Sequence, residues 1–200
     1  EHIEAIKHNG IQLSGTQGSF SVPVKALHLH EVQSLFKTPV DIAFICTKSY
    51  DTEWATMMIK QYLASDGYVL SLQNSINEDR IAGIVGWGKV VGCIASNIGV
   101  DAFKAGHVMR TLQPGGTAYT VFRVGEVHGR ITPRVQELVD MLKVVDSAKA
   151  TTNLWGERWS KLVINSMGNG ISASTGLNSK TMTELQMTRR LSIKLAGEAI

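Results

Sequence analysis

The sequence predicts an α/β fold, in which a Rossmann-like parallel sheet with an antiparallel extension is followed by an all-α C-terminal domain. Three short apolar runs rich in β-formers, at 40–47, 68–72 and 89–95, alternate with helical patterns. Such near-continuous apolar runs are typical of strands buried on both faces of a sheet. Strands and helices that alternate in this order favour right-handed parallel crossovers. After residue 153 the pattern is helical throughout.

The segment before the first buried strand predicts smaller elements. Residues 1–7 are expected to end a helix, and 11–14 and 20–27 to form strands joined by a glycine-containing turn. The first buried strand is followed by a helix that Gly67 is expected to close. A further helix is expected over 76–85, before the third strand.

The antiparallel extension is predicted from a change of pattern after the third strand. Residues 108–112 and 118–124 alternate in polarity and flank a Gln-Pro-Gly-Gly turn, which predicts a hairpin or an antiparallel extension. Thr132 and Pro133 suit the N-cap and the first position of a helix. The apolar face of that helix consists of Val135, Leu138, Val139 and Leu142.

A polar stretch of small residues at 146–153 predicts a domain boundary. We therefore divide the chain into 1–148, which contains the sheet, and 149–200, which is helical. The chain begins without methionine and ends within a helical run, so both ends are expected to be cut.

The composition excludes several classes of protein. A content of 44% hydrophobic and 18% charged residues is sufficient for a folded core. The net charge of +3 argues against nucleic-acid binding, and no apolar run reaches the roughly 18 residues that a membrane span needs. Cys46 and Cys93 lie in apolar surroundings and are expected to be buried, reduced thiols of a cytoplasmic protein. No spacing of His, Cys or acidic residues predicts a metal site.

Two polar residues follow neighbouring strands at their carboxyl ends. Lys48 ends the first buried run, and Asn74 follows the second in SLQNS. Ligands of open α/β sheets bind in the crevice beyond the carboxyl ends of the strands, so the two side chains are expected to share one crevice. Alternatively, Lys48 is a solvated loop lysine and Asn74 a turn former.

A polar stripe runs along the helix expected after residue 153. At 100° per residue, four side chains fall within an arc of about 80°, namely Lys161, Asn165, Asn169 and Ser172. Because apolar residues cover most of the rest, the helix is expected to be largely buried, and the stripe predicts a cavity wall. A solvent-facing stripe is the alternative. Desolvation would make Lys161 a proton donor near neutral pH, and amides suit hydroxyl and carboxylate groups.

Residues 168–173 fit the pattern G-x-G-x-x-A. The dinucleotide-binding version of this pattern follows a strand and opens a helix. Here it lies within or at the end of a helical stretch, so we interpret it as coincidence or as a helix break.

Five segments together resemble the ketopantoate reductase (2-dehydropantoate 2-reductase) family. In family order they are EHIEAIKHNGIQL, DIAFICTKSYDT, SLQN, GEVHG and WSKLVINSMGNGISASTG. The pattern W-x-K-L-x-x-N-x-x-x-N in the last segment is quite specific. The resemblance implies an NADP-binding Rossmann-like domain over 1–148 and a helical substrate and dimerisation domain over 149–200.

The resemblance further implies the NADPH-dependent reduction of a 2-keto acid, 2-dehydropantoate (ketopantoate), to pantoate in pantothenate biosynthesis. Lys161 would be catalytic, protonating the new alkoxide while hydride arrives from the nicotinamide. The implied binding residues are Asn165, Asn169 and Asn74 for the substrate, and Lys48, Asn74 and Ile98 for the cofactor. Asn178 is a further implied substrate contact.

The chain departs from the family pattern at two positions and leaves alternatives open. Ser75 stands where the family usually has Gly after QN, and Gly170 stands where it usually has Pro. Neither the opening strand with G-x-G-x-x-G nor the late Ser and Glu site residues are found, so the N-terminal segment and the end of the C-terminal domain are expected to be lacking. The alternatives are a reductase of another 2-keto acid and a non-catalytic Rossmann-like binding module. The apolar helices are compatible with a homodimer.

Overall fold

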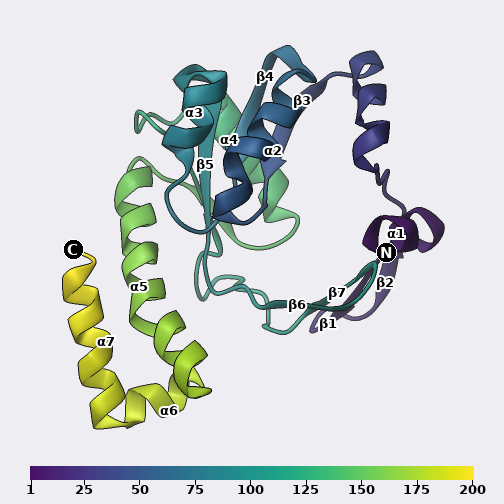
Figure 1. The fold of residues 1–200 in the computed structure, drawn as a ribbon. Coiled ribbons are helices and arrows are strands. Elements are labelled where there is room, and N and C mark those ends of the chain that lie inside the picture. Colours follow the sequence, from purple (N-terminus) through teal and green to yellow (C-terminus); the bar gives the residue numbers. More distant parts are fainter.

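The computed structural model describes residues 1–200, which form two sheets and seven α-helices (Figure 1). The main sheet has the order β3-β4-β5-β8-β9. Its strands are β3 (Val40–Ile45), β4 (Leu63–Ser71), β5 (Val90–Ala95), β8 (Phe122–Glu126) and β9 (Ala148–Ala150). The first three are parallel, β8 is antiparallel to β5, and β9 is parallel to β8. The predicted parallel sheet with an antiparallel extension is thus confirmed.

Helices cover both faces of the main sheet. The helices α2 (Thr52–Lys60) and α3 (Glu78–Val85) pack on one face, and α4 (Pro133–Lys143) packs on the other. Successive strand residues point to opposite faces. Val69 therefore packs under α2 and α3, while Leu70 packs under α4. The start of α4 is as predicted, because the side chain of its N-cap Thr132 accepts the backbone N–H of Val135.

Of the two alternatives predicted over 108–124, the hairpin is wrong, because its two halves belong to different sheets, and the antiparallel extension is confirmed by β8. β8 lies in the main sheet, whereas β7 (His107–Arg110) lies in a small sheet of order β2-β1-β7-β6. The other strands of the small sheet are β1 (Ile11–Gly15), β2 (Phe20–Val22) and β6 (Val100–Lys104). β7 pairs with β1 in parallel and with β6 antiparallel. Alternation marks a strand but does not identify its partner.

The prediction that Gly67 closes a helix is wrong, because Gly67 lies inside β4. The register of β3 against β4 shifts in the stretch that contains Gly67, between the pairs Val40–Leu63 and Ile42–Tyr68. A Cβ at position 67 would lie 2.6 Å from the carbonyl oxygen of Val40. Glycine is needed here because the neighbouring backbone approaches closely.

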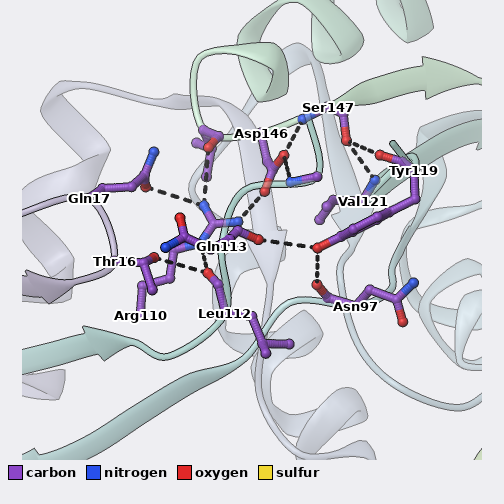
Figure 2. Close-up of polar contacts among 12 residues, drawn as sticks. Thr16, Gln17, Asn97, Arg110, Leu112, Gln113, Tyr119, Val121, Asp146 and Ser147 are labelled. Carbon is purple, nitrogen blue, oxygen red and sulfur yellow. Dashed lines mark hydrogen bonds and ion pairs between the residues drawn. The ribbon is translucent and has the colours of Figure 1, made fainter. Parts of the chain in front are cut away.

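An ion pair fastens the small sheet to the main one (Figure 2). Arg110 on β7 pairs with Asp146, which follows α4, and the two side chains are 11% and 1% exposed. Asp146 also accepts backbone N–H groups from Gly115 at 2.9 Å and Ser147 at 2.6 Å. Burial disfavours the charge on Asp146, but the hydrogen bonds from Arg110 and these amides outweigh it and lower its pKa. We call Arg110 and Asp146 the clasp.

The C-terminal part is helical, as predicted. After β9 come α5 (Leu154–Thr175), α6 (Ser179–Glu184) and α7 (Gln186–Glu198), and α7 packs along α5 (Figure 1). The polar stretch 146–153 contains β9, so the predicted domain division after residue 148 falls inside a strand. The division into two domains stays a prediction. The expectation that α5 is largely buried is wrong, since Ile164 is 66% and Trp159 51% exposed. The sheet and α7 leave parts of this helix uncovered.

The N-terminal helix α1 (His2–Asn9) precedes the small sheet, where the sequence predicted the tail of a helix. A 3-10 segment, η1 (Leu29–Lys37), leads from β2 to β3. None of the helices is both long and apolar enough to cross a membrane.

Candidate functional site

A cavity of about 770 Å³ lies beyond the carboxyl ends of the parallel strands. Four predicted site residues line it, namely Lys48 after β3, Asn74 after β4, Ile98 after β5 and Lys161 from α5. The strand order explains why Lys48, Asn74 and Ile98 meet, because β3, β4 and β5 are adjacent and their carboxyl ends face the same way. The volume lies within the roughly 300–1,000 Å³ typical of small-molecule sites.

The loops that carry Lys48 and Asn74 are held by neighbours that the sequence analysis did not single out. Gln73 donates from Nε2 to the carbonyl of Thr47 at 2.8 Å, and Ser49 donates from Oγ to Asn77 Oδ1 at 2.6 Å. The side chains of Lys48 and Asn74 make no hydrogen bond within the chain. They are therefore free to bind a ligand. No signal in the sequence other than the Q of SLQN pointed to Gln73.

Ser75 has a φ of 72°, in the left-handed region. This explains why the resembling family favours Gly at this position, since Gly adopts that conformation without a steric cost. The departure at Ser75 is thus accommodated at the expense of local backbone strain.

Lys161 reaches from α5 toward the end of β5. Its Nζ donates a hydrogen bond to the carbonyl oxygen of Ala95, the last residue of that strand. Partial burial, followed by the positive charge of Arg158, lowers the pKa of Lys161, and Cys93 opposes the shift slightly. An ammonium has three donors, so two remain for a ligand after the bond to Ala95.

Arg158, one turn before Lys161, anchors α5 to the sheet, and the sequence analysis missed it. Its side chain is 1% exposed and pairs with Glu78, which is fully buried. Arg158 also donates to the carbonyls of Gln73 at 2.6 Å and Ser71 at 2.9 Å. The available signal was a charged residue within an apolar stretch of helix, because such residues are rarely fully buried without a partner.

Asn165 and Asn169 do not line the cavity of Lys161. They line a second pocket of about 480 Å³ between α5, α6 and α7. Ser172, the last member of the predicted stripe, lines it too, so the stripe is divided between this pocket and the cavity of Lys161. Asn178 accepts the backbone N–H of Thr181 at 2.9 Å and caps α6. The glycine pattern at 168–173 lies inside α5, as predicted.

The two cysteines differ. Cys93 is buried in β5, as predicted, and burial raises its pKa to about 12. The prediction that Cys46 is buried is wrong, because it follows the last residue of β3, is exposed and lines the Lys161 cavity. The chain has no group of three or more His, Cys, Asp or Glu side chains that could hold a metal ion.

A family model described as ketopantoate reductase PanE/ApbA matches residues 1–123. The chain belongs to the ketopantoate reductase family. This family consists of oxidoreductases, and its match covers α1 through the start of β8, including the loops of Lys48 and Asn74.

Two curated relatives are 2-dehydropantoate 2-reductases. The enzyme of Pyrococcus horikoshii is 30% identical over 173 residues, which are 86% of this chain and 52% of the relative. That of Aquifex aeolicus is 27% identical over 197 residues, which are 95% of this chain and 59% of the relative. The chain thus spans little more than half the length of these relatives.

Solved structures share the fold. The 2-dehydropantoate 2-reductase of Geobacter metallireducens superposes with a TM-score of 0.83 at 23% identity, over 100% of this chain and 64% of that one. A D-mandelate dehydrogenase, solved with NADH and anilino(oxo)acetate, superposes with a TM-score of 0.81 at 18% identity, over 96% and 59% of the two chains. Identities this low establish the arrangement of the elements alone.

Proposed function

We propose that this chain forms the catalytic core of an NADPH-dependent reductase that converts a 2-keto acid to a 2-hydroxy acid, with ketopantoate as substrate and pantoate as product. The observation that carries the proposal is the position of Lys161, whose ammonium reaches into the cavity at the carboxyl ends of β3, β4 and β5. The family match and both curated relatives favour ketopantoate among 2-keto acids.

The lining of the cavity fits the nicotinamide end of a dinucleotide. Lys48 and Asn74 offer unpartnered donors, and Ile98 and Leu72 supply apolar surface. A bound nicotinamide would supply the hydride. The preference for NADPH over NADH rests on the resemblance to the family, and NADH is to be tested beside it because the D-mandelate dehydrogenase was solved with NADH.

In this proposal Lys161 donates a proton to the substrate oxygen as the carbonyl carbon gains hydride. Its bond to the Ala95 carbonyl fixes the direction of the ammonium. Burial and the charge of Arg158 lower its pKa, which brings proton donation closer to neutral pH. Until the proton is transferred, the positive charge of the ammonium stabilises the developing alkoxide in surroundings partly shielded from water. Asn74 contacts both the cofactor and the substrate, and Asn165 and Asn169 bind the substrate beyond Lys161.

Replacing Lys161 by alanine tests the proposal. In the protein that carries these residues, Lys161→Ala should reduce the turnover of ketopantoate, followed by NADPH absorbance, by about 100-fold or more, which is the usual contribution of a general acid. Binding of NADPH should survive. The exposed Lys194 on α7 supplies the control, Lys194→Ala, which should leave turnover unchanged.

Undiminished turnover in Lys161→Ala would show that Lys161 is not the proton donor. A wild-type protein that binds NADPH but reduces no 2-keto acid would instead support a non-catalytic binding module. Reduction of another 2-keto acid in preference to ketopantoate would support the proposed reaction but contradict the proposed substrate.

The proposal extends to assembly and location. Exposed apolar side chains on and beside α7, with Met187 85% and Leu191 47% exposed, support a homodimer through the helical part. Light scattering would measure the mass of the assembly. The free thiol of buried Cys93 supports a cytoplasmic location.

A further inference from the structure

The pocket between α5, α6 and α7 is rich in unused hydrogen-bond donors. The side chains of Asn165 and Asn169 on α5 and of Arg189 on α7 all line it, and none makes a hydrogen bond or ion pair within the chain. Ser192, one turn after Arg189, lines it as well. No Asp or Glu is part of the lining, so the pocket carries the uncompensated positive charge of one guanidinium.

Four apolar side chains also line the pocket, beside the further hydroxyl groups of Ser172, Ser179 and Thr183. Ile164 and Met167 of α5, Met182 of α6 and Ile193 of α7 face the same hollow. A planar guanidinium beside amides suits a carboxylate or phosphate, which it can bind through two parallel hydrogen bonds. The aliphatic side chains suit a carbon chain that leads to such an anionic group.

The position of this pocket along α5 decides which end of a substrate it receives. With a rise of 1.5 Å per residue, Asn165 lies about 6 Å and Asn169 about 12 Å along the helix axis from Lys161. In a 2-keto acid, the first carboxylate is only one carbon–carbon bond, about 1.5 Å, from the reacting carbonyl carbon. A substrate whose carbonyl meets Lys161 therefore keeps that carboxylate close to the lysine. A group at Arg189 must belong to the opposite end of the molecule.

We propose that Arg189 is a specificity-determining residue and that the pocket of Arg189, Asn165 and Asn169 binds an anionic group at the far end of a 2-keto acid. This inference rests on the proposed reductase function and revises its substrate, because the far end of ketopantoate carries an uncharged hydroxyl group. The favoured substrates are 2-keto acids that end in a second carboxylate or a phosphate, joined to the keto acid by an aliphatic chain.

The matched pair of substrates 2-ketoadipate and 2-ketohexanoate tests the proposal, because the two acids have equal chain length and differ only in the terminal carboxylate. In the protein that carries these residues, kcat/KM with NADPH should favour 2-ketoadipate by about 10- to 100-fold, the range expected of one charged hydrogen-bonded pair. Arg189→Gln should abolish this preference. Arg190→Gln is the control, since Arg190 is also exposed and is adjacent but does not line the pocket. A phosphorylated 2-keto acid, assayed in the same way, distinguishes phosphate from carboxylate.

Two outcomes would overturn the proposal. If Arg189→Gln lowered the turnover of both acids by the same factor, Arg189 would meet the carboxylate that they share. If the wild-type protein showed no preference, the pocket would have no part in selection.

A second measurement separates this proposal from the reductase function on which it rests. Adipate and hexanoate, which lack the keto group, are titrated into the 200-residue chain by calorimetry without cofactor. Adipate should bind more tightly than hexanoate in the wild type and in Arg190→Gln, but not in Arg189→Gln. If this pattern appears while no 2-keto acid is reduced, the anion pocket stands and the reductase function fails. Equal binding of adipate by all three proteins would refute the proposal that Arg189 binds an anionic group in this pocket.

Discussion

Replacing Arg158 by methionine should destabilise the protein more than any exposed charge change, because it leaves a buried carboxylate without its cation. Arg158 and Glu78 have side chains that are 1% and 0% exposed. Removal of one partner of such a pair costs about 3–5 kcal/mol of unfolding free energy. For a chain of this size that corresponds to a fall of about 6–20 °C in Tm. Since α5 is held to the sheet by the same arginine, Lys161 should also lose its position, and turnover should fall.

Urea unfolding followed by circular dichroism measures the loss. The more exposed pair of Arg123 and Glu157, whose side chains are 23% and 31% exposed and lie 3.3 Å apart, supplies the control, and Arg123→Met should cost about 1 kcal/mol or less. The double variant Arg158→Met/Glu78→Met should regain most of the stability, because replacing a buried ion pair with apolar side chains is often neutral. A loss in Arg158→Met no greater than in Arg123→Met would refute the reasoning, as would a double variant that is less stable than the single one.

Three further predictions concern other parts of the molecule. Ser75→Gly should raise the unfolding free energy by about 1 kcal/mol in denaturant titrations, because it relieves a left-handed backbone. Iodoacetamide should label Cys46 in the native chain and Cys93 only after denaturation, as mass spectrometry would detect; equal labelling of both would contradict the burial described for Cys93. The clasp should weaken in acid: the lowered pKa of Asp146 contributes stability that is present above the ordinary Asp pKa, about 4, and is lost as pH falls through the lowered value. Asp146→Asn should flatten this part of the Tm–pH curve, and an unchanged curve would exclude Asp146 as its source.

Local patterns in the sequence predict the main sheet well. Its buried strands have two apolar faces, so their residues form near-continuous apolar runs, and the Thr132 cap requires contacts only within one turn. The meeting of Lys48 and Asn74 follows from a general rule about the carboxyl ends of parallel strands, which needs the strand order but no detailed geometry.

The errors arise where distant segments decide the outcome. One of the two partners of β7 is β1, which lies about 95 residues earlier in the chain, and no local turn signal encodes that pairing. Gly67 resembles a helix stop, but the close carbonyl of Val40 explains it. Arg158 has no neighbour in the sequence that reveals Glu78 as its partner. Likewise, Arg189 lines a pocket with residues of α5 only because α7 packs along α5, and no local pattern in the sequence reveals that packing.

The small sheet has a consequence for the order of folding. Its central pairing joins Gln12 to His107, and the intervening chain contributes three strands of the main sheet. Contacts between residues so far apart in sequence form late, because the chain must first lose the entropy of closing a long loop. The main sheet is therefore expected to assemble first and to bring β7 within reach of β1. During refolding, amides of β1 should gain protection from hydrogen exchange after those of β4 and β5, and a protease pulse should cut the first residues of the chain while the main sheet already resists it.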